Sequence, residues 1–313
     1  MNRVLIYIIF VVITITSCKK DIVIIPNNNA PIYSEIPTIL LENYVNRLYI
    51  DLIGREPLND EMSLDVQFLR DNDVSFQSRE SLIYKLQFDT VFVPGDSSYK
   101  QAYFHRLYEM VKVRLIEGVS DGYIQNEMGI HYFFYEVDSI AGNLIQAHNN
   151  LIKYYRLKKI INSKSNLYNA SIDIKEMHRR MVNSSIYDQI NMNTFNFVNA
   201  AFDNLLFRYP TQYEFNNSYA MIEDKEPYTV LGYSGTNKED FINIISNSRE
   251  FYEGIIHWTY LTLLARVPTT IETDFLMNDF YISCDFHKLQ RYVMQTDESV
   301  SYTHLTLPTT KQV

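Results

Sequence analysis

The sequence predicts an all-α protein of stacked helical hairpin repeats with a helical insertion. One pattern recurs three times, and in each copy apolar or small residues fall at offsets 0, 3, 4, 7 and 8, which is one face of a helix. Glycine and proline number only 9 each in 313 residues. This turn content is too low for a sandwich, a barrel or a doubly wound sheet and favours helices.

The recurring pattern ends in Arg-x-Pro-x-x-x-Glu and occupies residues 45–61, 198–214 and 256–272. The Arg, Pro and Glu content of the chain gives about 0.02 copies by chance, so three copies indicate an internal repeat. The predicted structural residues of the motif are Arg55, Pro57, Glu61, Arg208, Pro210, Thr211, Glu214, Arg266, Pro268, Thr269 and Glu272.

Each motif is expected to end one helix and begin the next. Proline disfavours helical geometry in the residue before it, so the first helix should end near Tyr209 or Val267, with the Arg at its negative C-terminal end. Thr211 and Thr269, each followed three residues later by Glu, predict capping boxes. In the first copy Leu58 replaces the Thr, and Asn59 is the expected cap. A ligand site made of the same Arg and Glu is the alternative to this structural role.

The N-terminus predicts export and lipid anchoring. Asn2 and Arg3 precede an apolar run over residues 4–15, which is too short for a stable transmembrane span and indicates a secretion signal over residues 1–18. The run ends in Ile-Thr-Ser-Cys18, which resembles the lipobox of bacterial lipoproteins. That resemblance implies acyl chains such as palmitate on Cys18 and a protein tethered to the membrane by lipid. A simple signal or short anchor with a chance Cys is the alternative.

Residues 19–38 contain an Asn run and three prolines, which predicts a flexible tether. Together with the Asn- and Tyr-rich composition, the segment from Ser17 to Asp21 resembles outer-membrane lipoproteins of the Bacteroidota. The resemblance implies a cell-envelope location in the outer membrane, on either its periplasmic or its surface face. Net charge is −9, so no nucleic-acid partner is expected.

Residues 39–120 form the first predicted repeat, with helices expected over 79–86 and 99–117. The order of Tyr49 to Pro57, the short helix and the aromatic helix resembles the helical domain of unknown function in secreted planctomycete proteins linked to cytochrome domains. More loosely, the repeats resemble those of phycobilisome linkers, with Ser248 to Phe251 matching a later element. These resemblances imply a helical binding or scaffold module. Without a haem-attachment Cys-x-x-Cys-His, cytochrome function does not transfer.

A helical insertion is predicted over residues 121–191. Its aromatic clusters, at residues 132–135 and 151–155, are expected in the core, with a binding surface as the alternative. The basic residues of this region are expected on a solvated helix face. They are Arg156, Lys158, Lys159, Arg179 and Arg180.

Repeats two and three are predicted over residues 192–249 and 250–298, as adjacent stacked units. Gly232 and Gly235 predict a loop, and Asn237 opens a short helix over 241–246. From residue 299 the chain resembles a translated sequencing adapter, so residues 299–313 are interpreted as a non-native tail.

The sequence carries no recognisable catalytic constellation. Its seven histidines have no metal-binding spacing, and Glu127 with His131 is expected to be an ordinary helix-face pair. No metal or cofactor is predicted. Cys284 lacks a motif-placed His and acid and is expected to be a buried apolar residue. Acid pairs distant in sequence remain open.

The leading functional prediction is a lipid-anchored cell-envelope protein that binds or scaffolds another envelope component, a protein or a glycan, and is not an enzyme. Two alternatives stay open. One is a glycan-binding lipoprotein of the starch-utilisation type, and the other is an envelope hydrolase without a recognisable motif.

Overall fold

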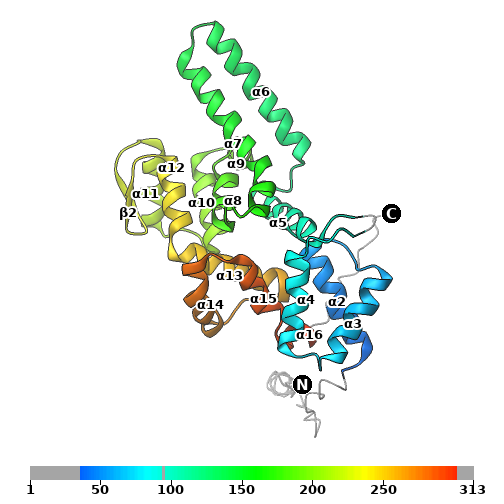
Figure 1. Cartoon of the computed structure of the whole chain (residues 1–313). Helices are drawn as coiled ribbons and strands as arrows, with labels where there is room; N and C mark the ends of the chain where they lie inside the picture. The colour runs from blue at the N-terminus through cyan, green and yellow to red at the C-terminus, as the bar shows by residue number, and fades with distance from the viewer. Residues whose placement is uncertain (1–35, 94–95, 302–313) are drawn as a thin grey trace, which may run out of the picture.

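The computed structural model describes residues 36–93 and 96–301, where it has 15 helices and one two-stranded sheet (Figure 1). This confirms the predicted all-α fold with helical repeats. The predicted signal, most of the tether and the lipid-anchoring Cys18 lie outside the described residues.

The repeats form three four-helix units, in which each Arg-x-Pro-x-x-x-Glu motif joins the first helix to the second. Unit one comprises α2 (Thr38–Ile53), α3 (Asn59–Asp71), α4 (Phe76–Phe88) and α5 (Tyr99–Ile116). Unit two comprises α10 (Thr194–Leu206), α11 (Gln212–Glu223), α12 (Lys238–Asn247) and α13 (Arg249–Leu264). Unit three comprises α13 again, α14 (Thr270–Ser283), α15 (Phe286–Met294) and α16 (Asp297–Ser301). The fourth helix of unit two is therefore the first helix of unit three.

The shared helix α13 packs closely on α10. A Cβ atom at Gly254 would lie 2.3 Å from the carbonyl oxygen of Leu205, so only glycine permits this approach of the two backbones. Units two and three are thus neighbours, as the sequence predicts. The boundary predicted between residues 249 and 250 falls at the first residues of α13.

The insertion contains α6 (Asp121–Ile140), α7 (Leu144–Tyr168), α8 (Ile174–Val182) and α9 (Ser185–Asn191). Helices α6 and α7 form a hairpin that projects from the rest of the molecule (Figure 1). The base of α7 packs against α5, α8 and α9, whereas α6 has α7 as its principal neighbour.

A short hairpin replaces the loop predicted around Gly232 and Gly235. Strands β1 (Tyr228–Val230) and β2 (Tyr233–Gly235) pair antiparallel, with Tyr228 opposite Gly235. The two turn residues, Leu231 and Gly232, both have positive φ angles, of 50° and 83°. A two-residue turn of this kind matches the twist of the paired strands, which accounts for the sheet.

Unit one packs against unit three, although unit two and the insertion separate them in sequence. The Tyr44 hydroxyl on α2 donates to the carbonyl of Met294 at 3.0 Å, and Arg47 donates to the carbonyl of Ser299 at 2.7 Å. Ser299 and Val300 are buried. The tail predicted to begin at residue 299 therefore starts inside α16, and residues 302–313 lie outside the described part.

Candidate partner-binding surface

The repeat motif forms a closed polar network in unit two. The terminal nitrogens of Arg208 donate to both carboxylate oxygens of Glu214 at 2.8 and 2.7 Å. Its Nε donates to Glu250 at 2.6 Å, and one terminal nitrogen also donates to the carbonyl of Tyr209 at 3.2 Å. The planar guanidinium is therefore held by two carboxylates and a backbone oxygen.

The same geometry recurs in the other units. Arg55 donates to both oxygens of Glu61 at 2.7 and 2.8 Å and to Asp96 at 2.5 Å. Arg266 donates to both oxygens of Glu272 at 2.9 and 2.6 Å. It also donates to Glu298 at 2.6 Å.

The second carboxylate of each network lies in the first turn of the fourth helix of its unit or, for Asp96, just before that helix, a contact that the sequence analysis missed. Glu250 and Glu298 each follow a capping Ser248 or Thr296 by two residues. Asp96 instead precedes the cap Ser98 by two residues, so the first copy does not share this order of cap and acid. Searching for Ser/Thr-x-Glu after each motif would have found two of the three acids.

Each motif arginine also lies over an aromatic ring six residues before it. The distances from Cζ to the ring centroid are 5.6 Å for Arg55 over Tyr49 and 5.2 Å for Arg208 over Phe202. For Arg266 over Tyr260 the distance is 4.9 Å. An aromatic residue at this offset is thus a further element of the repeat.

The helix before each motif ends three residues earlier than the proline argument predicts. Helix α10 ends at Leu206 and α13 at Leu264, because Phe207 and Ala265 take the left-handed conformation that terminates a helix. Gly54 plays the same part in unit one. Pro210, and likewise Pro57 and Pro268, lies in the short connection between the two helices.

The predicted capping boxes are present at Thr211 and Thr269, the caps of α11 and α14. The prediction for the first copy is wrong: Leu58 is the capping position, and Asn59 is the first residue of α3. Arg55 positions Glu61 so that its carboxylate accepts from the Leu58 amide at 2.7 Å, and no capping hydroxyl is needed to hold it there. The bond from Arg208 holds the pKa of Glu214 at about 2, and that from Arg266 does the same for Glu272. These contacts occupy the hydrogen-bond donors and acceptors of the motif, which favours a structural role over a ligand site.

A cavity of about 570 Å³, which we call the central cavity, lies where unit one, the insertion and unit three meet. Its wall includes Phe104 and Tyr168 together with Asp173, Cys284 and Asp285. Both carboxylates cap helices: Asp173 accepts from the Glu176 amide at 2.7 Å, and Asp285 accepts from the Lys288 amide at 3.0 Å. Two acids separated in sequence do converge here, but backbone contacts hold both.

The pKa values of Asp285 and Cys284 on this cavity wall are both shifted away from neutral pH. Hydrogen bonding from His287 lowers the pKa of Asp285 to about 2, so this carboxylate cannot act as a general acid near neutral pH. Burial raises the pKa of the Cys284 thiol to about 12, so the thiol stays protonated and is not a nucleophile. Cys284 is half-buried on the cavity wall rather than in the core. Within residues 36–93 and 96–301, no cluster of three or more His, Cys, Asp or Glu suits a metal ion.

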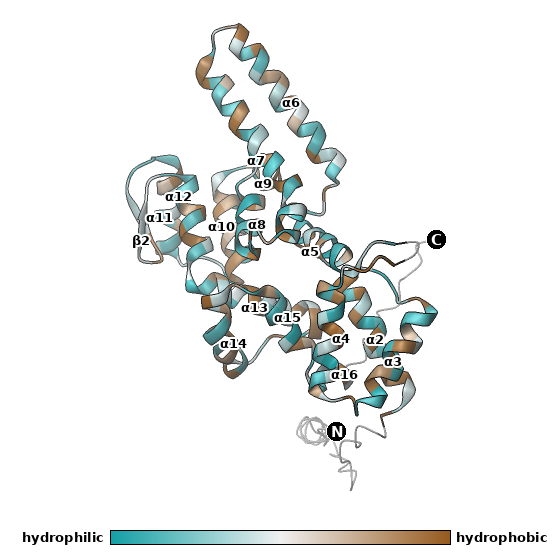
Figure 2. Ribbon diagram, viewed as in Figure 1, coloured by the Kyte–Doolittle hydropathy of each residue, from teal (hydrophilic) through white to brown (hydrophobic). Residues whose placement is uncertain are grey.

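The outward face of α6 is apolar, and no helix or strand of the described residues covers it. Its residues follow helical spacing on the side opposite the buried Ile124 and His131. Phe133 is 59 % exposed and Ile140, near the tip, 89 % exposed. Figure 2 shows hydrophobic residues along the projecting hairpin. We define the outward face of α6 as Ile130, Phe133, Phe134, Val137 and Ile140.

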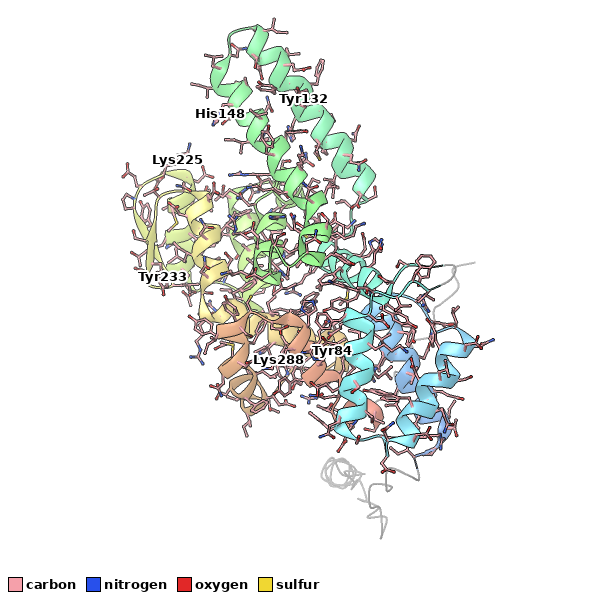
Figure 3. All side chains as sticks on the ribbon, viewed as in Figure 1. Tyr84, Tyr132, His148, Lys225, Tyr233 and Lys288 are labelled. Atoms are coloured by element: carbon pink, nitrogen blue, oxygen red, sulfur yellow. The ribbon has the colours of Figure 1, made fainter. Side chains whose placement is uncertain are left out.

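The core interpretation of the aromatic clusters is therefore wrong for Tyr132, Phe133 and Phe134 and, in the second cluster, for Tyr155, because all four side chains are exposed. Tyr132, labelled in Figure 3, packs its ring against Tyr154 of α7 at 5.4 Å between centroids. Phe133 and Phe134 are exposed, and within the described residues α6 has no principal neighbour besides α7 to cover them. Sequence periodicity alone does not distinguish a face that meets the core from one that meets a partner.

Charge is divided unevenly between the two helices of the hairpin. Helix α6 carries Asp121, Glu127, Glu136 and Asp138 and no Lys or Arg. Helix α7 carries Lys153, Arg156, Lys158, Lys159 and Lys164 and no Asp or Glu. Within the described part of the chain, Glu127, Glu136 and Asp138 form no ion pair.

Three polar contacts join the base of the hairpin to α9, one of them from the Tyr123 hydroxyl to Gln189 at 3.4 Å. Glu127 accepts from Gln189 at 2.9 Å, and His131 Nε2 lies 3.2 Å from the Ser185 hydroxyl. Glu127 and His131, expected to be an ordinary helix-face pair, thus each bond to α9. The outward face is held in a fixed position relative to the rest of the insertion.

In the part of the chain that the structure describes, every helix is too short or too polar to cross a bilayer. Comparison of the chain with protein-family models, with curated proteins and with solved structures gave no match.

Proposed function

We propose that this protein is a lipid-anchored cell-envelope protein that holds a partner protein by docking a basic amphipathic helix of that partner on the outward face of α6. The observation that carries the proposal is the row of exposed apolar side chains on a projecting helix. An exposed apolar row with helical spacing is the surface into which an amphipathic helix fits.

The charge around the row favours a basic partner. Glu127 and Asp138 lie along one edge of the outward face and Glu136 along the other, and none has an ion pair within the described residues. Lysine or arginine flanking the apolar stripe of a partner helix would find these carboxylates on both sides. The same acids disfavour a second α6 and an anionic lipid surface as occupants.

The sequence supports the membrane location. Cys18 ends a lipobox-like segment, and residues 19–38 have the composition of a tether, which supports an outer-membrane lipoprotein facing its partner in the envelope. Cys18→Ser should leave the protein unprocessed or untethered in membrane fractionation. Detergent-requiring attachment of the substituted protein after signal removal would contradict lipid anchoring.

The roles of the polar groups that line the central cavity favour binding over catalysis. Its two carboxylates serve as helix caps, and its thiol is protonated near neutral pH. A hydrolase would need a group with a pKa suited to proton transfer or nucleophilic attack at this position.

The test uses two designed helical peptides that share a leucine stripe and differ in having lysine or glutamate flanks. We expect the lysine peptide to bind saturably to the purified protein, more weakly as salt rises, and the glutamate peptide to bind at least about tenfold more weakly. The double variant Phe133→Gln/Val137→Gln should lose about tenfold or more in affinity for the lysine peptide. Ile271→Gln, at a comparably exposed position on α14 that is 82 % accessible, is the control and should bind like the unsubstituted protein.

Equal affinity of all three proteins for the lysine peptide would refute the proposal. It would also be refuted if the double variant instead abolished self-association in sedimentation or binding to phospholipid vesicles. Those results would assign the face to a second copy or to a bilayer.

Glycan binding in the central cavity is a second candidate, favoured by the aromatic wall that includes Phe88, Phe104 and Tyr168 beside Lys100 and Asp173. Aromatic rings and a few polar groups are the usual components of a sugar site. Tyr168→Ala should then abolish binding of envelope oligosaccharides in calorimetry while leaving the lysine peptide bound.

A further inference from the structure

Basic residues that are scattered in sequence line one small pocket on the side of the insertion. Helix α7 contributes Arg156 and Lys159, and α8 contributes Arg179 and Arg180. Asn183 after α8 and Glu239 of α12 complete the lining of a cavity of about 50 Å³. The pocket has room for a small group and not for an extended ligand. The solvated helix face predicted for these residues is therefore a convergent site.

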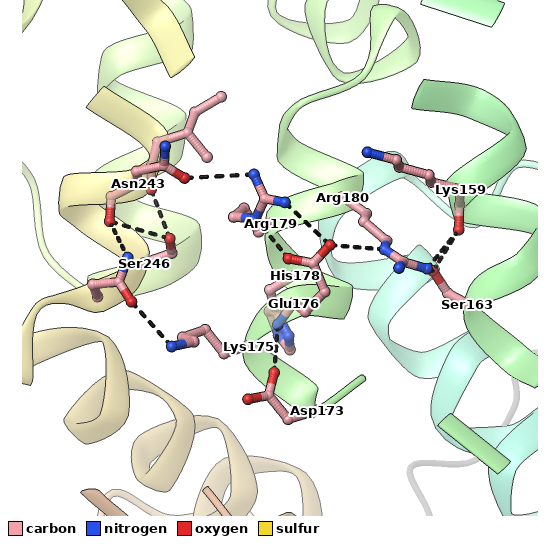
Figure 4. A network of polar contacts seen from close by, with 12 residues as sticks. Lys159, Ser163, Asp173, Lys175, Glu176, His178, Arg179, Arg180, Asn243 and Ser246 are labelled. Atoms are coloured by element: carbon pink, nitrogen blue, oxygen red, sulfur yellow. Dashed lines mark hydrogen bonds and ion pairs between the residues drawn. The ribbon is translucent and has the colours of Figure 1, made fainter. Parts of the chain in front are cut away.

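Internal contacts fix the two arginines of α8. Glu176 accepts from Arg179 Nε at 2.6 Å and from Arg180 Nε at 2.9 Å (Figure 4). Arg180 also donates to the Lys159 carbonyl at 3.1 Å and to Asn166 at 2.8 Å, which ties α8 to α7. The positive charges are thus held at one place before any ligand arrives.

The two basic residues of α7 keep donors available. Within the described residues Lys159 Nζ forms no ion pair, and Figure 4 shows it extending from α7 toward α8 with no bond drawn to it. Within the same residues the guanidinium of Arg156 forms one hydrogen bond, to Glu239 at 3.1 Å, so most of its donors stay available. Four cations thus share two carboxylates, Glu176 and Glu239.

Two further observations indicate an anion. The pKa of the nearby Lys238 is lowered by burial and also by the charges of Arg156 and Lys153, which indicates positive potential in this region. Asn183 is buried, and its Oδ1 accepts no hydrogen bond from the described part of the chain. A protonated oxygen of a monoanionic phosphate could donate to that atom.

We infer that the pocket formed by Arg156, Lys159, Arg179 and Asn183 binds the phosphate group of a phosphorylated ligand. Guanidinium and ammonium donors arriving from two helices match the several oxygens of one tetrahedral oxyanion. The pocket is separate from the outward face of α6, so this inference does not depend on the proposed function.

Glu239 supplies a built-in test because its carboxylate holds Arg156 at the pocket rim. An entering phosphate must compete with this carboxylate for Arg156 and is repelled by it. Removing the charge of Glu239 should therefore strengthen phosphate binding, whereas removing the donors should weaken it. A merely structural role for these residues gives no such pair of opposite effects.

Inorganic phosphate is the probe, titrated into the purified chain at constant ionic strength with chloride as the comparison anion. We expect saturable binding that Arg156→Gln/Lys159→Gln weakens by about tenfold or more and Glu239→Gln strengthens by about threefold. Lys225→Gln, on the exposed loop after α11 labelled in Figure 3, is the control and should leave binding unchanged. The Arg156–Glu239 pair is partly exposed, so these variants should fold, which circular dichroism checks.

Absence of saturable phosphate binding, or equal binding by the double variant and the control, would overturn the inference. So would an affinity unchanged by Glu239→Gln. Vesicles of phosphatidylglycerol and of phosphatidylcholine then identify the source of the phosphate. Binding to phosphatidylglycerol that free phosphate displaces and the double variant lacks indicates a lipid head group, and failure to bind these vesicles indicates a soluble phosphorylated ligand.

Discussion

In unit two, the guanidinium of Arg208 contacts two carboxylates, a backbone carbonyl and an aromatic ring. In the hairpin, five apolar side chains of α6 stay exposed, and three of its carboxylates form no ion pair within the described residues. The two regions are both helical and both amphipathic. They differ in whether their polar groups and apolar side chains find partners within the chain.

This difference separates stability from recognition. A helix whose polar groups and apolar face both find partners in the chain contributes to the fold and leaves little for a ligand. A helix with an uncovered apolar row gains stability when another molecule covers that row. We therefore expect substitutions in the repeats to change the free energy of unfolding, and substitutions on the outward face of α6 to change binding.

Two mid-helix glycines give the largest contrast. Gly254→Ala should lower the free energy of unfolding by about 3 kcal/mol, because its Cβ would overlap the Leu205 carbonyl and push α13 away from α10. Gly129→Ala on α6 should instead raise it by about 0.5–1 kcal/mol, because no atom lies within 4 Å of the new Cβ and alanine is the better helix former. Urea denaturation of both variants measures the difference, and two shifts of the same sign would contradict this account of packing.

Substitution of the motif arginine should have the next largest effect on the free energy of unfolding. Arg208→Gln should cost about 2 kcal/mol at neutral pH, because it leaves Glu214 and Glu250 without their shared cation. Lys153→Gln, in the hairpin and without an ion pair in the described residues, should change the free energy of unfolding by less than about 0.5 kcal/mol.

Arg208→Gln should also change how the free energy of unfolding depends on pH. The folded pKa of Glu214 is about 2, below its ordinary value of 4.5, so its contribution is complete above that ordinary value and is lost as pH falls toward 2. Without Arg208 the pKa of Glu214 should return toward its ordinary value, and the loss of stability in this pH range should become shallower. Equal pH dependence of the two proteins in denaturant melts would show that the ion pair does not set that pKa.

Helix caps give the smallest effect. Thr211→Ala and Thr269→Ala should each lower the free energy of unfolding by about 1 kcal/mol, because the amide of Glu214 or Glu272 loses its hydroxyl acceptor. Leu58→Thr should raise it by about 0.5 kcal/mol, since the first copy lacks this hydroxyl. Affinity for the lysine peptide should not change in any of the three. Lost binding with an unchanged denaturation midpoint would make the motif a ligand site.

Local sequence patterns predict the local structure well. Helical periodicity and the threefold motif indicate the fold class, and Thr-x-x-Glu indicates the caps of α11 and α14. These features depend on residues a few positions apart. The second carboxylate of each arginine lies much further along the chain, and the fold brings the two together: Glu250, for example, lies 42 residues after Arg208.

Sequence patterns do not predict which helix surfaces meet in the folded protein. The apolar spacing of Phe133 and Val137 is the same whether the face meets the core or solvent, and the projection of the hairpin decides between them. The phosphate pocket likewise needs α7 and α8 to bring Lys159 beside Arg180. The contact of unit one with unit three has no counterpart in the repeat pattern.

That last contact makes folding depend on the whole length of the chain. Tyr44 bonds to Met294 and Arg47 to Ser299, pairs separated by 250 and 252 residues. The closure entropy of so long a loop must be met before these bonds form, so they should belong to a late step of folding. During synthesis, α2 is made before the other described helices yet completes its packing only after α15 and α16 have followed. The face of α2 that meets α16 thus remains uncovered longest, which makes it the part of unit one most exposed to aggregation and proteolysis before folding ends.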